Sequence, residues 1–141
     1  MKDLSHNKDL GLLIMRVIIG AIFLIHGYLK LTDMAGTIGF FSHVGLPVLL
    51  AYVVTAIEFF GGISLILGYG SKIASLLLAL EMFGAMFSLH AGNGFNVSTG
   101  GYEYALTMFA VTFGLYLIGP GAYGLGSECG CPTKDGTCAV K

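Results

Sequence analysis

The sequence predicts an all-α integral membrane protein, a four-helix bundle with both termini in the cytoplasm. Of its 141 residues, 55% are hydrophobic and 11% are charged, whereas a soluble domain usually holds about 25% charged residues. The mean hydropathy is +0.83. The apolar residues gather in four runs, and a helix needs about 20 such residues to cross a bilayer. The lipid bilayer is therefore the expected partner, and the net charge of −1 argues against a nucleic-acid partner.

The first apolar run, Leu10–Leu31, follows a polar segment at residues 1–9. We expect this run to form the first transmembrane helix, with Lys30 extending its ammonium group toward the membrane surface. The connector Thr32–Gly45 carries the aromatic pair Phe40 and Phe41. An apolar pair of this kind predicts a short helix that lies on the membrane surface.

Three further spans are expected, each bounded by residues that favour turns. The pair of glycines around Tyr69 predicts a tight turn between the second and third spans. A loop rich in Gly, Asn and Ser covers residues 91–101, and Gly119-Pro120-Gly121 ends the last helix because proline cannot continue it. The expected spans are Pro47–Leu67, Ile73–Leu89 and the shorter Tyr102–Ile118.

The distribution of lysines predicts the orientation. With four spans, the N-terminus, the second connection and the C-terminus lie on one side of the membrane. That side holds five of the six lysines, the other side holds only Lys30, and positive charge favours the cytoplasm. We therefore expect a multi-pass inner (plasma) membrane protein with a cytoplasmic segment at 1–9, a bundle at 10–125 and a cytoplasmic tail at 126–141. The lysines on that side are Lys2, Lys8, Lys72, Lys134 and Lys141.

Arg16, Glu58 and Glu81 interrupt three different spans. By residue count the two glutamates fall near the bilayer midplane, and the long side chain of Arg16, which lies nearer the start of its span, can reach toward them. A charge at that depth costs from ~2.5 to more than ~10 kcal/mol, so we expect the three side chains to form one buried network. An arginine fork can hydrogen-bond carboxylate oxygens in pairs. Two interpretations remain open: a site for catalysis or transport, or an ion network that only sets helix register.

A second polar group is expected at the outer ends of the helices. His26 and Lys30 lie four residues apart and so share one helix face, while His90 closes the third span and Glu103 opens the fourth. These four residues predict a small outer vestibule. Its histidines are either proton- or metal-exchanging groups or ordinary residues at the membrane interface.

The three cysteines, Cys129, Cys131 and Cys138, all lie in the C-terminal tail. Closely spaced thiolates suit Cu(I) or zinc, although three ligands and this spacing do not match a paired zinc motif. A thiol redox role is a second interpretation. In the third, the tail is disordered and its cysteines have no function.

The chain resembles the DoxX family of small bacterial four-helix membrane proteins over about Leu10–Leu125. The resemblance implies a four-helix bundle with cytoplasmic termini. Some members of the wider family are subunits of sulfur-metabolism enzymes that pass electrons to quinone, and others are grouped with proteins that detoxify oxidants. The cysteine tail departs from the family pattern. The matching residues are Arg16-Val-Ile-Ile-Gly20, His26-Gly27, Lys30-Leu31, Gly45-Leu46-Pro47, Glu58-Phe-Phe-Gly61-Gly62, Leu67-Gly68, Glu81, His90 and Gly119-Pro120-Gly121-Ala122-Tyr123.

Three functions are consistent with these features. The first is a subunit of a membrane redox system, linked to quinone and to sulfur or oxidative-stress chemistry, with soluble redox enzymes at the cytoplasmic face or a second copy as partner. The second is a small proton-coupled solute transporter that uses the same buried charges. The third is a non-catalytic membrane scaffold for soluble enzymes. The sequence leaves open whether the chain is itself an enzyme.

Overall fold

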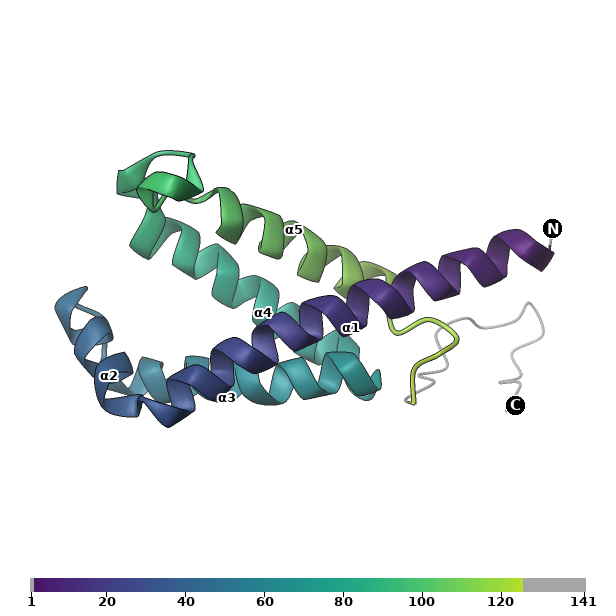
Figure 1. The fold of residues 1–141 in the computed structure, drawn as a ribbon, viewed down its shortest axis with the longest axis horizontal. Helices are drawn as coiled ribbons and strands as arrows, with labels where there is room; N and C mark the ends of the chain where they lie inside the picture. Colours follow the sequence, from purple (N-terminus) through teal and green to yellow (C-terminus); the bar gives the residue numbers. More distant parts are fainter. Residues whose placement is uncertain (1, 126–141) are drawn as a thin grey trace.

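In the computed structural model of the chain, residues 2–125 are described, and this part is all helical, with no strand among them. Four long helices form the body of the molecule, and a short helix joins the first two (Figure 1). The prediction of a helical membrane protein is confirmed. The helices are α1 (Lys2–Thr32), α2 (Met34–His43), α3 (Val48–Leu67), α4 (Ser71–Ala85) and α5 (Glu103–Ile118); a π-helical turn (Met86–His90) and two 3₁₀ turns (Ala91–Asn93 and Val97–Thr99) connect α4 to α5.

Three of the helical stretches are long and apolar enough to cross a membrane: Asn7–Thr32, Val48–Leu67 and Ser71–Leu89. The fourth predicted span, α5, is a shorter apolar helix of 16 residues. The side of the membrane on which the termini lie stays a prediction. The first helix begins before the polar segment ends, at Lys2, and the third span changes from α-helical to π-helical geometry after Ala85.

The helix ends follow from the residues that the sequence places there. Gly68 and Gly70 have φ angles of 71° and 61°, a left-handed conformation that glycine adopts without steric cost, and they form the predicted tight turn between α3 and α4. The Asp33 side chain begins α2 by accepting a hydrogen bond of 3.0 Å from the Gly36 backbone N–H, an ordinary N-cap. Gly119, directly before Pro120, caps the end of α5.

The long helices form two pairs. α1 packs along α3, α4 packs along α5, and the two pairs meet through α3 and α4. The pairs diverge toward the end that carries α2 and the 91–101 loop, as Figure 1 shows. In the first pair the backbones approach closely, because a Cβ on Gly27 would lie 2.5 Å from the Phe59 nitrogen. Small residues permit such contact between membrane helices.

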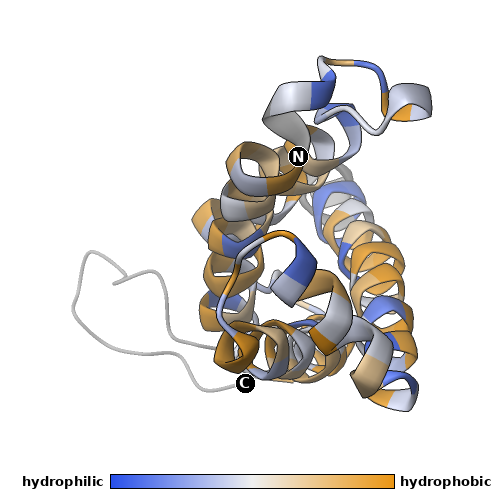
Figure 2. Cartoon of the chain, turned by 90° about the vertical axis from the view of Figure 1, so that its left-hand side faces the viewer, coloured by the Kyte–Doolittle hydropathy of each residue, from blue (hydrophilic) through white to orange (hydrophobic). Residues whose placement is uncertain are grey.

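The molecule buries polar groups and exposes apolar ones. Arg16 and Glu58 are among its most buried residues, whereas large apolar side chains point outward on every long helix; examples are Leu49, Phe60, Ile73 and Leu117. Figure 2 shows hydrophobic residues around the outside of the helices. An apolar surface on all sides fits hydrocarbon rather than water as the surrounding solvent. The innermost apolar cluster comprises Ile19, Phe23, Leu65, Leu78, Met108 and Leu115.

Candidate functional site

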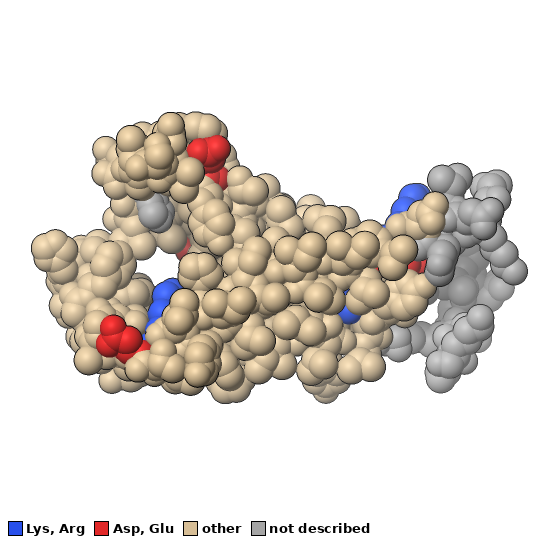
Figure 3. Space-filling view, in the orientation of Figure 1, with Lys and Arg blue, Asp and Glu red and all other residues tan. Residues whose placement is uncertain are grey.

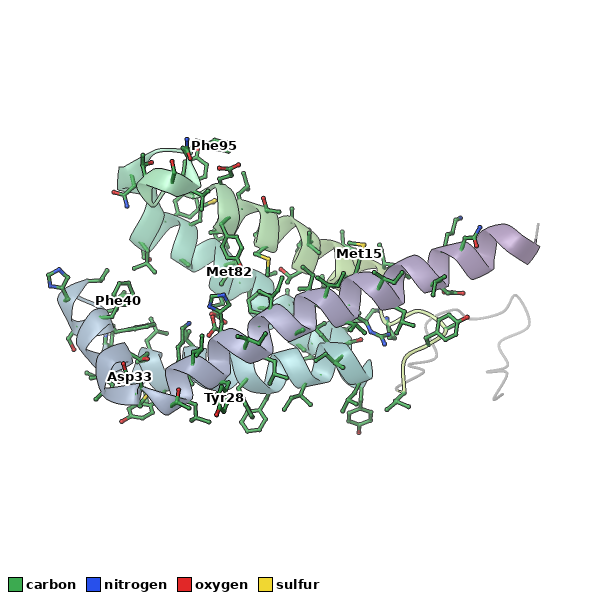
Figure 4. The ribbon with its side chains drawn as sticks, in the orientation of Figure 1. Met15, Tyr28, Asp33, Phe40, Met82 and Phe95 are labelled. Carbon is green, nitrogen blue, oxygen red and sulfur yellow. The ribbon has the colours of Figure 1, made fainter. Side chains whose placement is uncertain are left out.

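A cavity of about 640 Å³ lies between the diverging helix pairs. It is lined by the last turns of α1, by α2, by the first half of α3, by the last turns of α4 and by the start of α5. Figure 3 shows the molecule hollowed at this end, with charged atoms beside the hollow. Figure 4 shows Asp33 and Phe40 near α2, and Met82 on α4 across from them; all three line the cavity. The cavity therefore lies at the end of the bundle where the α1–α3 pair and the α4–α5 pair separate.

Most of the cavity lining is apolar. The aromatic residues are Phe23 on α1, Phe40 and Phe41 on α2, and Tyr104 on α5, and aliphatic side chains come from all the long helices. Such a surface suits a ring or a hydrocarbon chain. A few polar groups interrupt it, and a mostly apolar pocket with few polar groups is typical of small-molecule sites. These groups are His26, Lys30, Asp33, Thr37, Glu58, Glu81 and Ser88, together with the Tyr104 hydroxyl.

An ion pair joins α1 to α3 at the inner end of the cavity. Nζ of Lys30 lies 2.7 Å from Oε2 of Glu58. The Glu58 side chain is 5% exposed and that of Lys30 is 28% exposed. An ammonium group has three N–H donors, so Lys30 keeps donors for another molecule in the cavity. The close contact between Gly27 and Phe59 holds the two helices together within one turn of both charges.

Glu81 brings a second carboxyl group to Glu58 from α4. Glu81 interacts electrostatically with both Glu58 and Lys30, and all three side chains line the cavity. Oε2 of Glu58 and Oε2 of Glu81 are buried. In the described part of the chain, Oε2 of Glu58 has the ion pair with Lys30, and no donor bonds to Oε2 of Glu81. Lys30, Glu58 and Glu81 therefore form one cluster beside the cavity, which we call the carboxyl–lysine cluster.

The prediction that Arg16 belongs with Glu58 and Glu81 is wrong. Arg16 is 1% exposed and donates to backbone carbonyls instead: Nε to Leu65 at 2.9 Å, one terminal nitrogen to Tyr123 at 3.3 Å, and the other to Pro120. Leu65 lies in the last turn of α3, where carbonyls lack intrahelical partners and carry partial negative charge, and Pro120 and Tyr123 lie in the segment after α5. These carbonyls bind the guanidinium at the opposite end of the bundle from the cavity, and Lys30 takes the place predicted for Arg16.

The predicted outer vestibule is found in part. His26 and Lys30 both line the cavity. Glu103 is held elsewhere, because its Oε2 accepts a hydrogen bond of 3.1 Å from the Val97 backbone N–H in the loop before α5. The side chain of His90 lies outside the described part of the structure. A role for these residues in ligand entry stays a prediction.

Two features of the site escaped the prediction from sequence. Tyr104 lines the cavity, although nothing in its local pattern separates it from the other tyrosines. Lys30 was assigned to the vestibule and not to Glu58. The predicted thiol site, Cys129, Cys131 and Cys138, lies outside the described residues. Within the described residues no group of three or more His, Cys, Asp or Glu side chains is arranged to hold a metal ion.

Comparisons with known proteins now give the class of the chain. The DoxX family profile matches residues 11–91, and the chain belongs to the DoxX family. It is 36% identical to "Putative oxidoreductase CatD" of Bacillus subtilis over 79% of this chain and 83% of that protein. It is 27% identical to "Inner membrane protein YqjF" of Escherichia coli, over 84% of this chain and 91% of that protein. An uncharacterized protein of Haemophilus influenzae is 35% identical over 86% of this chain and 91% of its own length. No solved structure matches the chain.

Proposed function

We propose that this protein is the quinone-binding membrane component of a redox system in the inner membrane. One observation supports the proposal above all: the apolar cavity inside the helix bundle is lined by the carboxyl–lysine cluster. The name of the Bacillus subtilis relative, which contains the word oxidoreductase, supports the redox class. The name of the Escherichia coli relative supports the location.

The residues of the cavity fit a quinone head group. Its volume of about 640 Å³ lies within the range of about 300–1,000 Å³ typical of small-molecule sites. Phe23, Phe41 and Tyr104 offer aromatic surface for the ring. Lys30 offers an N–H donor to a ring carbonyl, and the apolar lining and open end suit a hydrocarbon tail. A bound quinone would supply two-electron chemistry in which two protons are also taken up.

The chain's own residues then have two tasks. The apolar walls hold the ring and exclude water, which strengthens the electrostatic interactions of the cluster. The carboxyl–lysine cluster orients the ring through Lys30, and it places the two carboxyl groups of Glu58 and Glu81 at the cavity, where a carboxyl group can exchange a proton with the ring. Electrons come from a partner, for which a soluble redox enzyme at the cytoplasmic face is the natural candidate.

The test is direct measurement of quinone binding to the full chain in lipid nanodiscs, using a short-tailed quinone. We expect saturable binding to the wild type, and binding at least about tenfold weaker in Lys30→Met, because a hydrogen bond from a charged donor is worth about 1.5–3 kcal/mol. Lys8→Met is the matched control, since Lys8 is an exposed cation on the same helix far from the cavity. Absence of binding to the wild type, or equal loss in both variants, would contradict the proposal.

The buried carboxyl pair also favours a second function, proton-coupled transport. Reconstitution in liposomes that enclose a pH-sensitive dye separates the two functions. Quinone binding without solute-dependent proton movement supports the redox component. Solute-dependent proton uptake that is lost in Glu81→Gln supports the transporter.

A further inference from the structure

The cavity has two facing walls, one from each pair of helices. Lys30 on α1 belongs to the α1–α3 wall and Tyr104 on α5 belongs to the α4–α5 wall, and both residues line the cavity. Nζ of Lys30 lies 2.7 Å from Oε2 of Glu58, and the Tyr104 phenol interacts electrostatically with the same glutamate. Lys30 and Tyr104 therefore reach the same region of the cavity from opposite walls.

The loop before α5 holds Tyr104 in place. The backbone N–H of Tyr102 donates to the Gly94 carbonyl at 3.1 Å, and that of Glu103 donates to the Phe95 carbonyl at 3.0 Å. The rings of Phe95 and Tyr102 pack edge to face with their centroids 5.5 Å apart. These contacts fix the first turn of α5 without a ligand, and a donor that is already in position loses little freedom on binding.

The other donors of the lining are used or placed elsewhere. The Thr37 hydroxyl bonds to two backbone carbonyls, at 2.9 and 3.4 Å. His26 lies four residues before Lys30 on the same helix, so it shares the wall of Lys30. Ser88 lies in the π-helical turn that follows α4, at the open end. Within the described part of the chain the Tyr104 hydroxyl makes no hydrogen bond, so it is free to donate to a ligand.

A quinone ring needs such a second donor. It has two carbonyl groups, and in a para-quinone they lie on opposite edges of the ring. Lys30 supplies a donor to one of them. A carbonyl oxygen only accepts hydrogen bonds, and a carbonyl that is moved out of water without a donor costs free energy. A ring between the two walls therefore meets a donor at each edge if Tyr104 faces the second carbonyl.

We propose that Tyr104 determines the specificity of the cavity: its hydroxyl donates to the ring carbonyl opposite the one that Lys30 binds, so the site selects para-quinones. This inference rests on the proposed function and deepens it, because it assigns the class of quinone and the residue that recognises it. A ring held by both donors also connects the α1–α3 pair to the α4–α5 pair at the end where they diverge.

The experiment measures the dissociation constants of two ligands of similar shape on the full chain in nanodiscs. One is dimethyl para-naphthoquinone, whose methyl groups block addition of thiols, and the other is the corresponding tetralone, which has one carbonyl. Lys30 is the charged and stronger donor, so it takes the single carbonyl of the tetralone. Tyr104→Phe removes only the hydroxyl. It should weaken naphthoquinone binding by about three- to tenfold and leave tetralone binding unchanged.

Tyr102→Phe is the matched control, because Tyr102 lies two residues away and packs on Phe95 in the loop. Both of its dissociation constants should equal those of the wild type. Infrared spectra of the bound naphthoquinone give a second readout that does not depend on affinity. The wild type should shift both carbonyl-stretch bands, and in Tyr104→Phe one band should return toward its position in free quinone.

The outcomes separate this inference from the proposed function. Equal weakening of both ligands in Tyr104→Phe would mean that the hydroxyl acts through Glu58 or through the shape of the cavity, and it would overturn the inference. Unchanged naphthoquinone binding in Tyr104→Phe, or identical infrared bands in that variant and the wild type, would overturn it too, while quinone binding itself still stands. Failure of the naphthoquinone to bind to the wild type would overturn the proposed function as well.

Discussion

Gly27→Ala tests whether close packing of α1 on α3 positions the carboxyl–lysine cluster. Gly27 is buried on α1, three residues before Lys30, and it contacts the residue that follows Glu58. A Cβ at this position would lie 2.5 Å from the backbone nitrogen of Phe59 and 2.8 Å from its Cα. Both atoms belong to the backbone, so no side-chain rotation relieves the clash. The two helices must move apart.

The size of the movement follows from these distances. Ordinary contact begins at 3.4 Å, so the backbones must separate locally by roughly 0.9 Å. Overpacking of this kind costs about 1–3 kcal/mol, and the better helix propensity of alanine returns at most about 1 kcal/mol. We expect Gly27→Ala to destabilise the bundle by about 1–2 kcal/mol. The separation also stretches the 2.7 Å contact between Lys30 and Glu58, so quinone binding should weaken.

Thermal unfolding of the protein in nanodiscs, followed by circular dichroism, measures the first effect, and the binding assay above measures the second. The control is Gly114→Ala on α5, where a Cβ would meet nothing within 4 Å; its midpoint should be unchanged or slightly higher. The reasoning fails if Gly27→Ala unfolds at the wild-type temperature, or if Gly114→Ala loses as much stability.

Three further outcomes are expected at the other end of the molecule and in the tail. Arg16→Met should lower the thermal midpoint by several degrees, because it removes the donor to three carbonyls. Each hydrogen bond from a charged group is worth about 1.5–3 kcal/mol, and the cost of burying the charge offsets part of that stabilisation. The control Lys8→Met should change the midpoint little. Tags at both termini should react with an impermeant reagent only after the cells are permeabilised, and labelling of intact cells would contradict the charge asymmetry. Truncation after Ser127 should leave the thermal midpoint unchanged but reduce Cu(I) uptake; equal uptake by both forms would exclude the tail as the metal site.

Hydropathy and turn residues were sufficient to predict the helices. The apolar runs became α1, α3, α4 and α5, and the turn at Gly68 and Gly70 formed as expected. The ends of the helices were less predictable. Hydropathy locates the part of a helix that hydrocarbon covers, and it contains no information on whether the helix continues into water, as α1 does toward Lys2.

The partner of Arg16 could not be predicted by counting depth and matching charge. Depth gives one coordinate of a side chain, whereas pairing also depends on which helices are neighbours and in what register. The prediction weighed carboxylates as the only partners for the guanidinium. It omitted the backbone carbonyls of the last turn of α3 and of the segment that follows α5, which Arg16 reaches at Leu65, Pro120 and Tyr123.

The glycines contain the missing information on register. Gly27 faces Phe59, and Gly20 faces Gly62, so α1 and α3 run antiparallel with these residues side by side. That register places Lys30 within one turn of Glu58, and it places Arg16 beside Gly68, where a Cβ would lie 2.7 Å from the guanidinium carbon. The register set by these glycine contacts therefore places Arg16 at the closed end of the α1–α3 pair and Lys30 at the end that carries the cavity. The arginine stabilises the closed end of the bundle, and the lysine leaves the carboxyl pair beside the cavity.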